Sequence, residues 1–272
     1  MWSSWSQGGY DPDSEKFFGA VGDHGWKNPH LYVVEYDIHS KSVKCLPEIN
    51  RTLGRKTNQF GDGKIHGYLD VYKPSFSDNN QLWFCTYWCR YPEPIESDFE
   101  TGYNAGHIMS WDIDKRCFID YGVPLERATW PIHRVDRKRG ILYAVGMFSE
   151  FLAWDIDKQQ IKWAGYLPPV GKEKDKWAIS PGMKWYNRVM LLDEHNGNIY
   201  SNNLISDKWS IIEYNPHKNR FYELDIDTGL SCPIRCYTRE RDKDGYFWGL
   251  TAVGELFSFH PDRKKFNLFD KI

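Results

Sequence analysis

Three histidines stand where acid–base chemistry could take place. His66 and His133 each follow an isoleucine, in Ile65-His66 and Ile132-His133, and His107 lies between them in the chain. The pKa of an imidazole lies near neutrality, so a histidine can take up or release a proton at physiological pH. Because the same Ile-His pair recurs in two successive repeats, we expect both side chains to point toward one central space.

Arginine and tyrosine side chains near these histidines extend the chemistry that the segment could support. Arg134 directly follows His133, and Arg90 lies with Tyr87 and Tyr91 in an aromatic stretch ahead of His107. Arginine binds a carboxylate through two parallel hydrogen bonds and keeps its charge. Tyrosine can donate a proton, or accept one where a nearby cation lowers its pKa. These residue types are sufficient for proton transfer next to a bound carboxylate.

No cofactor is predicted from these residues. The alternative of a structural divalent metal held by His66, His107 and His133 stays open, because neutral imidazoles bind zinc and manganese. The six cysteines include two pairs with three intervening residues, Cys85 with Cys89 and Cys232 with Cys236. Positions i and i+4 of a strand lie about 13 Å apart, too far for one metal ion or one disulfide. We therefore expect buried free thiols.

The elements that must position these residues form an internal repeat of short strands. In each copy an apolar strand ends in an aromatic residue followed by Asp, Asn or His, and a polar turn leads into another strand. Five copies are visible: Val33–Asp37, Ile108–Asp112, Phe151–Asp155, Ile211–Asn215 and Leu256–His260. This pattern predicts β-hairpins with tight turns, and the polar residue after each aromatic is expected to cap the turn.

A further aromatic-rich strand precedes four of these hairpins, and three of those strands follow turns that end in Gly140, Gly197 and Gly245. The intervals between successive copies match the roughly 40 to 50 residues of a propeller blade if two of the intervals contain insertions. The sequence therefore predicts an all-β fold, a β-propeller of four-stranded antiparallel blades. We expect a single domain over residues 1–272, with the alternative that its ring is incomplete at one end.

Composition excludes some classes of partner. The formal net charge is −2, with 35 Lys and Arg against 37 Asp and Glu, so there is no bulk field to attract nucleic acid or an anionic membrane. The apolar runs are too short to span a bilayer. We expect neither nucleic acid nor a membrane as partner, and a monomer. The first residues show no basic segment followed by an apolar stretch, so no signal peptide is predicted and the localisation stays open.

The chain resembles the propeller-fold polysaccharide lyases typified by ulvan lyases and, more distantly, oligogalacturonate lyase. Three motifs carry the resemblance: Gly63-Lys64-Ile65-His66, Phe84-Cys85-Thr86-Tyr87-Trp88 and Ala105-Gly106-His107. It extends to segments that recur from blade to blade, of the types Arg139-Gly140-Ile141-Leu142-Tyr143 and Trp154-Asp155. The resemblance implies a seven-bladed propeller of the kind that is typically secreted or periplasmic. It also implies cleavage next to a uronate by two histidines on neighbouring strands, a tyrosine and an arginine.

This sequence departs from that pattern at several positions. His107 matches the second histidine of the pair, but Tyr87 stands at the position of the first. Phe148 stands near the position of the tyrosine of the next blade. No arginine stands near Gly165 and Tyr166, where the arginine of the family would lie.

β-Elimination next to a uronate requires a cation for the carboxylate, a base for the C5 proton and an acid for the leaving O4. We expect His107 to be the base and Tyr87 or Tyr91 the acid. Arg90 or Arg134 is expected to bind the carboxylate. The resulting prediction is a polysaccharide lyase acting on an acidic, uronate-containing glycan.

Other residues are expected to bind the substrate without reacting. His66 and His133 would orient it, and exposed Trp88, Tyr91 and Tyr103 would stack on sugar rings. Packing between blades is the alternative role for Trp88. The alternative function is a non-catalytic propeller that binds a glycan or a protein partner.

Overall fold

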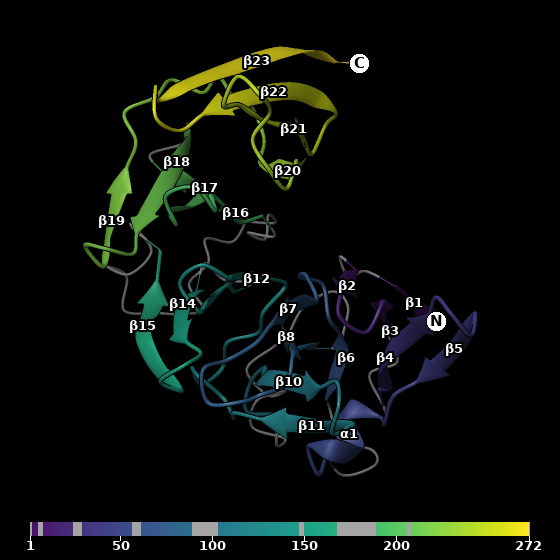
Figure 1. Ribbon diagram of the computed structural model, residues 1–272. Coiled ribbons are helices and arrows are strands. Elements are labelled where there is room, and N and C mark those ends of the chain that lie inside the picture. Colours follow the sequence, from purple (N-terminus) through teal and green to yellow (C-terminus); the bar gives the residue numbers. More distant parts are fainter. Residues whose placement is uncertain are drawn as a thin grey trace. The chain divides into compact units, whose positions relative to one another are not determined.

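The computed structural model describes residues 2–4, 8–23, 29–55, 61–88, 103–146, 150–167, 189–205 and 208–271. The described chain is all β apart from one single-turn helix, α1 (Ile49–Thr52) (Figure 1). It divides into two compact units, one made of Met1–Gly146 with Leu152–Ala164 and the other of Met147–Phe151 with Gly165–Ile272.

Three sheets lie wholly or mainly in the first unit, and each follows the order of the chain. The first sheet pairs both β1 and β2 with β3 and continues through β4 to β5. Its strands are β1 (Trp2–Ser3), β2 (Gly9–Asp11), β3 (Lys16–Asp23), β4 (Leu31–Asp37) and β5 (Ser42–Cys45). The second sheet contains β7 (Asp70–Tyr72), β8 (Gln81–Cys85), β10 (Ile108–Asp112) and β11 (Cys117–Asp120). The third contains β12 (Ile132–Asp136), β13 (Ile141–Val145), β14 (Glu150–Asp155) and β15 (Gln160–Tyr166).

The second unit contains two further four-stranded antiparallel sheets of the same order. The fourth sheet consists of β16 (Leu191–Leu192), β17 (Ile199–Ile205), β18 (Lys208–Asn215) and β19 (Arg220–Glu223). The fifth consists of β20 (Ile234–Tyr237), β21 (Phe247–Thr251), β22 (Glu255–His260) and β23 (Lys265–Lys271). The all-β, antiparallel organisation predicted from the repeat is therefore confirmed, with four strands in four of these sheets and five in the first.

All five predicted hairpins are present, and their turns share one geometry. The polar residue after the aromatic accepts the backbone N–H three residues later in every copy: Asp37 from Ser40 (2.8 Å), Asp112 from Lys115 (2.8 Å), Asp155 from Lys158 (3.0 Å), Asn215 from Lys218 (3.0 Å) and His260 from Arg263 (3.4 Å). The next residue adopts φ between 49° and 59° in each turn: Lys41, Arg116, Gln159, Asn219 and Lys264. The predicted capping role is confirmed, because the side chain satisfies an amide that the turn leaves unpaired.

The first sheet contains a further turn of this kind, which the sequence pattern did not reveal. Asp11 accepts the backbone N–H of Ser14 at 3.2 Å, and Glu15 adopts φ 52° between β2 and β3. The short segment ahead of the first repeat therefore supplies the inner strands of a complete sheet.

The segment around His66 is not a strand, although the matching Ile-His pair at His133 lies on β12. β6 (Asp62–Lys64) ends before it and β7 begins after it, so His66 lies between strands. β6 pairs instead with β9 (Tyr87–Trp88) in a separate two-stranded sheet. Next to His66 the backbone passes close to β12, since a Cβ on Gly67 would lie 2.3 Å from Nδ1 of His133. Only glycine allows this approach.

Aromatic and branched side chains fill the spaces between successive sheets. One cluster joins the first and second sheets, with Phe18 and Val33 against Leu82 and Trp111. A second joins the second and third sheets and includes Trp83, Trp130 and Trp154. In the second unit, Tyr200 and Ile211 pack with Phe247 and Phe257. Of the repeated aromatics, Trp111 and Trp154 lie in these clusters, whereas Tyr36 is 38% exposed.

The cysteines differ partly from expectation. Cys85 and Cys232 are buried free thiols, but Cys45, Cys117 and Cys236 are exposed, so that expectation is wrong for these three. The exposed cysteines lie on β5, β11 and β20, which are edge strands of their sheets and are covered on fewer sides. Cys89 lies outside the described residues. None of the helices that the structure describes is long and apolar enough to cross a membrane.

Candidate functional site

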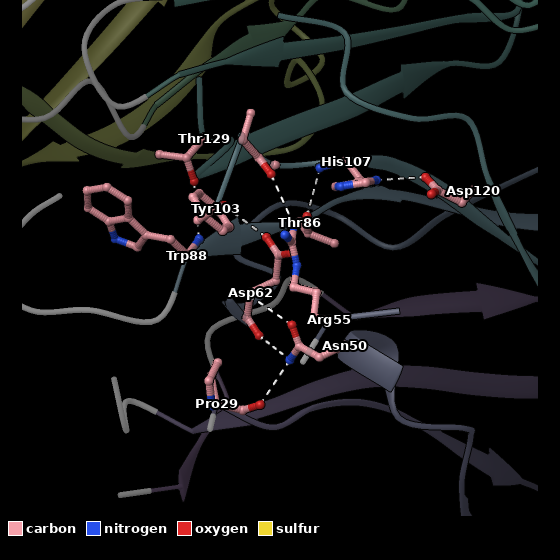
Figure 2. A network of polar contacts seen from close by, with 12 residues as sticks. Pro29, Asn50, Arg55, Asp62, Thr86, Trp88, Tyr103, His107, Asp120 and Thr129 are labelled. Atoms are coloured by element: carbon pink, nitrogen blue, oxygen red, sulfur yellow. Dashed lines mark hydrogen bonds and ion pairs between the residues drawn. The ribbon is translucent and has the colours of Figure 1, made fainter. Parts of the chain in front are cut away.

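A buried carboxylate, Asp62, organises the polar network of Figure 2. Arg55 donates to its Oδ2 from Nε at 3.0 Å and from Nη2 at 2.7 Å, and the Tyr103 hydroxyl donates to Oδ1 at 3.0 Å. Burial and then the Asp62 charge raise the pKa of Tyr103 well above its usual value, so its hydroxyl is a neutral donor. Burial disfavours the charge on Arg55, but the Asp62 carboxylate outweighs this and raises the pKa of the guanidinium.

The backbone of Asp62 is held as firmly as its side chain. Asn50 donates from Nδ2 to the carbonyl of Asp62 at 2.7 Å and accepts from the Asp62 amide at 3.0 Å. Arg55 also donates to the carbonyl of Ala105 at 3.3 Å. The network thus holds the segment before β10 against β6 and α1. Because this segment leads directly into His107, the network also limits the movement of His107.

His107 lies just ahead of β10 and forms a pair with a carboxylate. Its Nδ1 lies 2.9 Å from Oδ1 of Asp120, the last residue of β11. Partial burial favours the neutral form of Asp120, but hydrogen bonds from His107 and from the Gly122 amide outweigh it and lower the pKa of the carboxyl. The His107 side chain is 16% exposed and that of Asp120 36%, so solvent reaches both. A carboxylate at Nδ1 assigns the proton to that nitrogen and leaves Nε2 as the basic one.

The backbone around His107 is tied to the end of β8. The His107 amide donates to Oγ1 of Thr86 at 2.9 Å, and the Thr86 amide donates to the His107 carbonyl at 3.0 Å. Gly106 packs against this strand, because a Cβ there would lie 2.3 Å from the Thr86 carbonyl oxygen. Trp130 donates from its indole to the Gly106 carbonyl at 3.2 Å. The position of the His107 ring is therefore set by rigid strand neighbours.

Tyr87 and His66 form a second group. Their rings pack with centroids 4.7 Å apart, and Nζ of Lys64 lies 5.2 Å from the centre of the Tyr87 ring. Tyr87 is buried and His66 partly buried. The side-chain hydrogen bond of His107 goes to Asp120.

His133 and Arg134 lie deeper than a substrate-binding role would favour. His133 is fully buried, and neither ring nitrogen has a hydrogen-bond partner among the residues that the structure describes. Burial lowers the pKa of His133 to about 4, although the Asp70 charge opposes the shift. Arg134 is also buried, with Nε 3.3 Å from Oδ2 of Asp70 and its guanidinium 4.2 Å from the centre of the Tyr68 ring. Arg134 therefore already faces a carboxylate of its own chain.

Two of the residues expected to stack on sugars are not exposed. Trp88 and Tyr103 are fully buried, so the expectation that they are exposed is wrong. The hydroxyl of Tyr103 binds Asp62, and the Trp88 amide donates to Oγ1 of Thr129 at 3.1 Å. Burial of Trp88 agrees with its alternative role in packing. Arg90 and Tyr91 lie outside the described residues, as does Phe148.

Sequence reasoning missed the acidic partners of the site. Asp120 could have been found from the predicted hairpin, since the turn after Asp112 sets a register in which Met109 faces Asp120, two residues from His107. Asp62 and Asp70 carried no such signal, because their partners come from distant segments. In the described ranges no group of three or more His, Cys, Asp or Glu residues is placed to hold a metal ion.

Comparison with known proteins gives no family assignment. No family model matches the chain, and no curated protein matches it.

Proposed function

We propose that the first sheet, with five strands, and the four sheets of four strands are blades of a β-propeller. Three observations support this: each sheet follows the order of the chain, all five outer hairpins share one turn geometry, and aromatic clusters fill the space between successive sheets within each unit. In this proposal the loops at one end of the inner strands surround the ligand site, as is usual for the fold.

We further propose that the chain is a polysaccharide-lyase-like protein that cleaves a uronate-containing glycan of the ulvan type by β-elimination. The observation that carries the proposal is the His107–Asp120 pair. It combines a partly exposed imidazole, a carboxylate that orients it, and a rigid backbone on both sides. This is the arrangement that general base catalysis by histidine requires.

The proposed reaction is an elimination in which one proton is removed from the substrate and one is donated to the leaving oxygen. Nε2 of His107 takes the C5 proton of the uronate, while the electron pair of the C5–H bond forms the C4–C5 double bond. The C4–O4 bond breaks, and a tyrosine protonates the departing O4. Asp120 stabilises the imidazolium that forms, because its carboxylate stays ionised and accepts the hydrogen bond from Nδ1–H throughout.

The cation for the uronate carboxylate is assigned to Arg90 in this proposal. Arg134 is a weaker candidate, since its guanidinium pairs with Asp70. Tyr91 and Tyr87 remain the candidate acids, and His66 beside Tyr87 is the candidate that orients the sugar. The buried His133 is not assigned a substrate contact.

A second candidate function is a non-catalytic propeller that binds a glycan or a protein partner. The observation that favours it is that several residues expected to bind the substrate instead contact other residues of the chain. Arg134 pairs with Asp70, Tyr103 binds Asp62, and Trp88 is fully buried. A site that had lost its chemistry would leave such residues to structural roles.

Incubation with ulvan and other uronate polysaccharides separates the two candidates. The lyase proposal predicts a growing ultraviolet absorbance from the unsaturated product, together with binding by calorimetry. Binding without product would favour the non-catalytic propeller. Neither signal with any acidic glycan would contradict both glycan proposals and leave a protein partner.

A further inference from the structure

Arg55 lies where three segments of the first unit meet. It follows α1, and its amide donates to the Asn50 carbonyl at 2.9 Å. Its guanidinium binds the buried Asp62 on β6 and the carbonyl of Ala105, and it lies 4.8 Å from the centre of the Tyr103 ring. The side chain is only 11% exposed. A planar fork of donors can make these contacts together, whereas the single ammonium group of a lysine cannot.

The contact with Ala105 bears on His107, which lies two residues further along the chain. Gly106 stands between them and donates its amide to the Ala128 carbonyl at 2.9 Å. The segment ahead of His107 is thus held by hydrogen bonds, one of them from a charged donor. Hydrogen bonds from charged donors are stronger than those between neutral groups. Loss of Arg55 would therefore loosen the segment that carries His107.

The charge of Arg55 also acts on the carboxylate that pairs with His107. Burial raises the pKa of Asp120, and hydrogen bonds from His107 and the Gly122 amide lower it more. The charges that lower this pKa further come from His107, before β10, and from Arg55, after α1. The influence is mutual: burial lowers the pKa of Arg55, but the charges of Asp62 and Asp120 are among the causes that raise it. Negative and positive charges therefore alternate from Asp62 through Arg55 to Asp120.

We propose that Arg55 is a positioning residue of the His107–Asp120 pair. Its hydrogen bond to Ala105 holds the segment that carries His107, and its charge favours the ionised Asp120 that orients the imidazole. The contacts of its guanidinium are with the chain itself, at Asp62 and Ala105, so it acts through the pair and not on the substrate. Its effect on turnover rests on the proposed lyase function, whereas its effect on Asp120 does not.

Titration of the Asp120 carboxyl by nuclear magnetic resonance, in the protein without substrate, tests the role of the charge. Arg55→Met removes the cation, Arg55→Lys keeps it, and Arg51→Met removes an exposed cation of α1 as the control. We expect Asp120 to titrate at a higher pH in Arg55→Met than in the wild type, and close to the wild-type pH in the other two. If Arg55→Met does not fold, because the buried Asp62 loses its cation, Asp62→Asn is compared with the double variant Asp62→Asn and Arg55→Met.

Turnover of a uronate polysaccharide tests the consequence for the proposed reaction. Because Arg55 positions His107 without touching the substrate, we expect Arg55→Met to lower kcat by about 10²-fold and to leave KM unchanged. Arg55→Lys should lose less, since it keeps the charge and gives up only the planar contacts with Asp62 and Ala105. Arg51→Met should retain the wild-type kcat. Circular dichroism confirms that each variant is folded.

Different results would contradict this proposal and the lyase proposal. A wild type that forms no unsaturated product contradicts the lyase proposal, and the Asp120 titration then still decides the role of Arg55. An unchanged Asp120 titration in Arg55→Met overturns the positioning role, whether or not the protein is a lyase. An equal shift in Arg51→Met would assign the effect to net charge, and an equal shift in Arg55→Lys would assign it to lost contacts; either result overturns the proposal. Wild-type kcat in Arg55→Met overturns it as well.

Discussion

Two histidines of this chain show how environment decides what an imidazole can do. His107 is partly exposed and paired with Asp120, so a proton can enter and leave at Nε2. His133 is fully buried against Gly67, and its pKa is lowered to about 4. The first environment suits proton transfer, whereas the second disfavours the charged form. We therefore assign chemistry to His107 and a structural role to His133.

Replacement of Asp120 by asparagine tests the orienting carboxylate. The neutral amide would remove the charge that stabilises the imidazolium and would allow the wrong tautomer, so we expect the turnover number to fall by about 10² to 10⁴-fold. The Asp114→Asn variant, at an exposed position in the turn between β10 and β11, serves as the control and should retain full activity. Equal activities of the Asp120→Asn variant and the wild type would rule out the orienting role.

The buried His133 predicts a pH-dependent loss of stability. Because its folded pKa of about 4 lies below the ordinary value of 6.5, the unfolded chain binds more protons between these two values. The contribution of neutral His133 is complete above pH 6.5 and declines as the pH falls toward 4, by at most about 1.4 kcal/mol per pH unit.

Urea unfolding of the His133→Leu variant over this pH range is the measurement. We expect a flatter dependence of the unfolding free energy on pH than in the wild type. If the unfolding free energy of His133→Leu depended on pH as steeply as that of the wild type, a group other than His133 would be responsible for the dependence.

At the scale of elements, repeated turns shape the hairpins, and buried ion pairs hold neighbouring elements together. Each outer turn places a residue other than glycine in the left-handed region, which costs about 1 kcal/mol per residue. Buried pairs then join neighbouring elements. Asp70 on β7 accepts from Arg134 and from the Val135 amide on β12, so one carboxylate links the second and third sheets.

Adjacent glutamines test the turn geometry. Gln159 has φ 51°, and Gln160 begins β15; both are exposed. We expect Gln159→Gly to raise the free energy of unfolding by about 0.5 to 1 kcal/mol, because glycine has no Cβ to strain in this region. Gln160→Gly should lower it by a similar amount, since glycine is unfavourable in a strand. Chemical denaturation measures both, and effects of equal sign would contradict the assigned turn.

Removal of the Asp70 carboxylate tests the link between sheets. Asp70→Ala deprives the buried Arg134 of its carboxylate, and we expect a loss of about 3 to 5 kcal/mol in the free energy of unfolding. The double variant Asp70→Leu with Arg134→Met should recover most of this loss, because both charges of the pair are removed. Failure of the double variant to recover would assign the loss to the Val135 hydrogen bond instead.

Local features of this fold were predictable, and contacts between distant segments were not. The five outer hairpins follow from a strand, an aromatic residue and a capping side chain close together in the chain. His107 stood out because it follows a stretch rich in aromatic and polar residues. Asp120 could be placed near it because the predicted hairpin sets the register of the two strands. His66 and His133 share the same Ile-His pair, yet the backbone at Gly67 places them in different surroundings. Such approaches depend on packing that no local pattern specifies.

At the scale of the whole molecule, the chain forms a series of similar sheets that differ in what packs against their faces. The second sheet has apolar neighbours on both faces, in two separate core clusters. The first sheet has one face in the core, and Tyr10, Phe17, Tyr36 and Val43 alternate with these core residues. The composition reflects this, with 45 aromatic residues formed by 13 Trp, 17 Tyr and 15 Phe. Sheets that pack face against face use such residues on both sides.

The initial rate of unsaturated product formation shows whether His107 acts as the base of a β-elimination, as we propose. Wild type, His107→Ala and His39→Ala are compared on the same uronate polysaccharide. We predict a measurable rate for the wild type and for His39→Ala, and a rate at least about 10²-fold lower for His107→Ala. Full activity of a folded His107→Ala variant, or no product from the wild type with any uronate glycan, would contradict the claim.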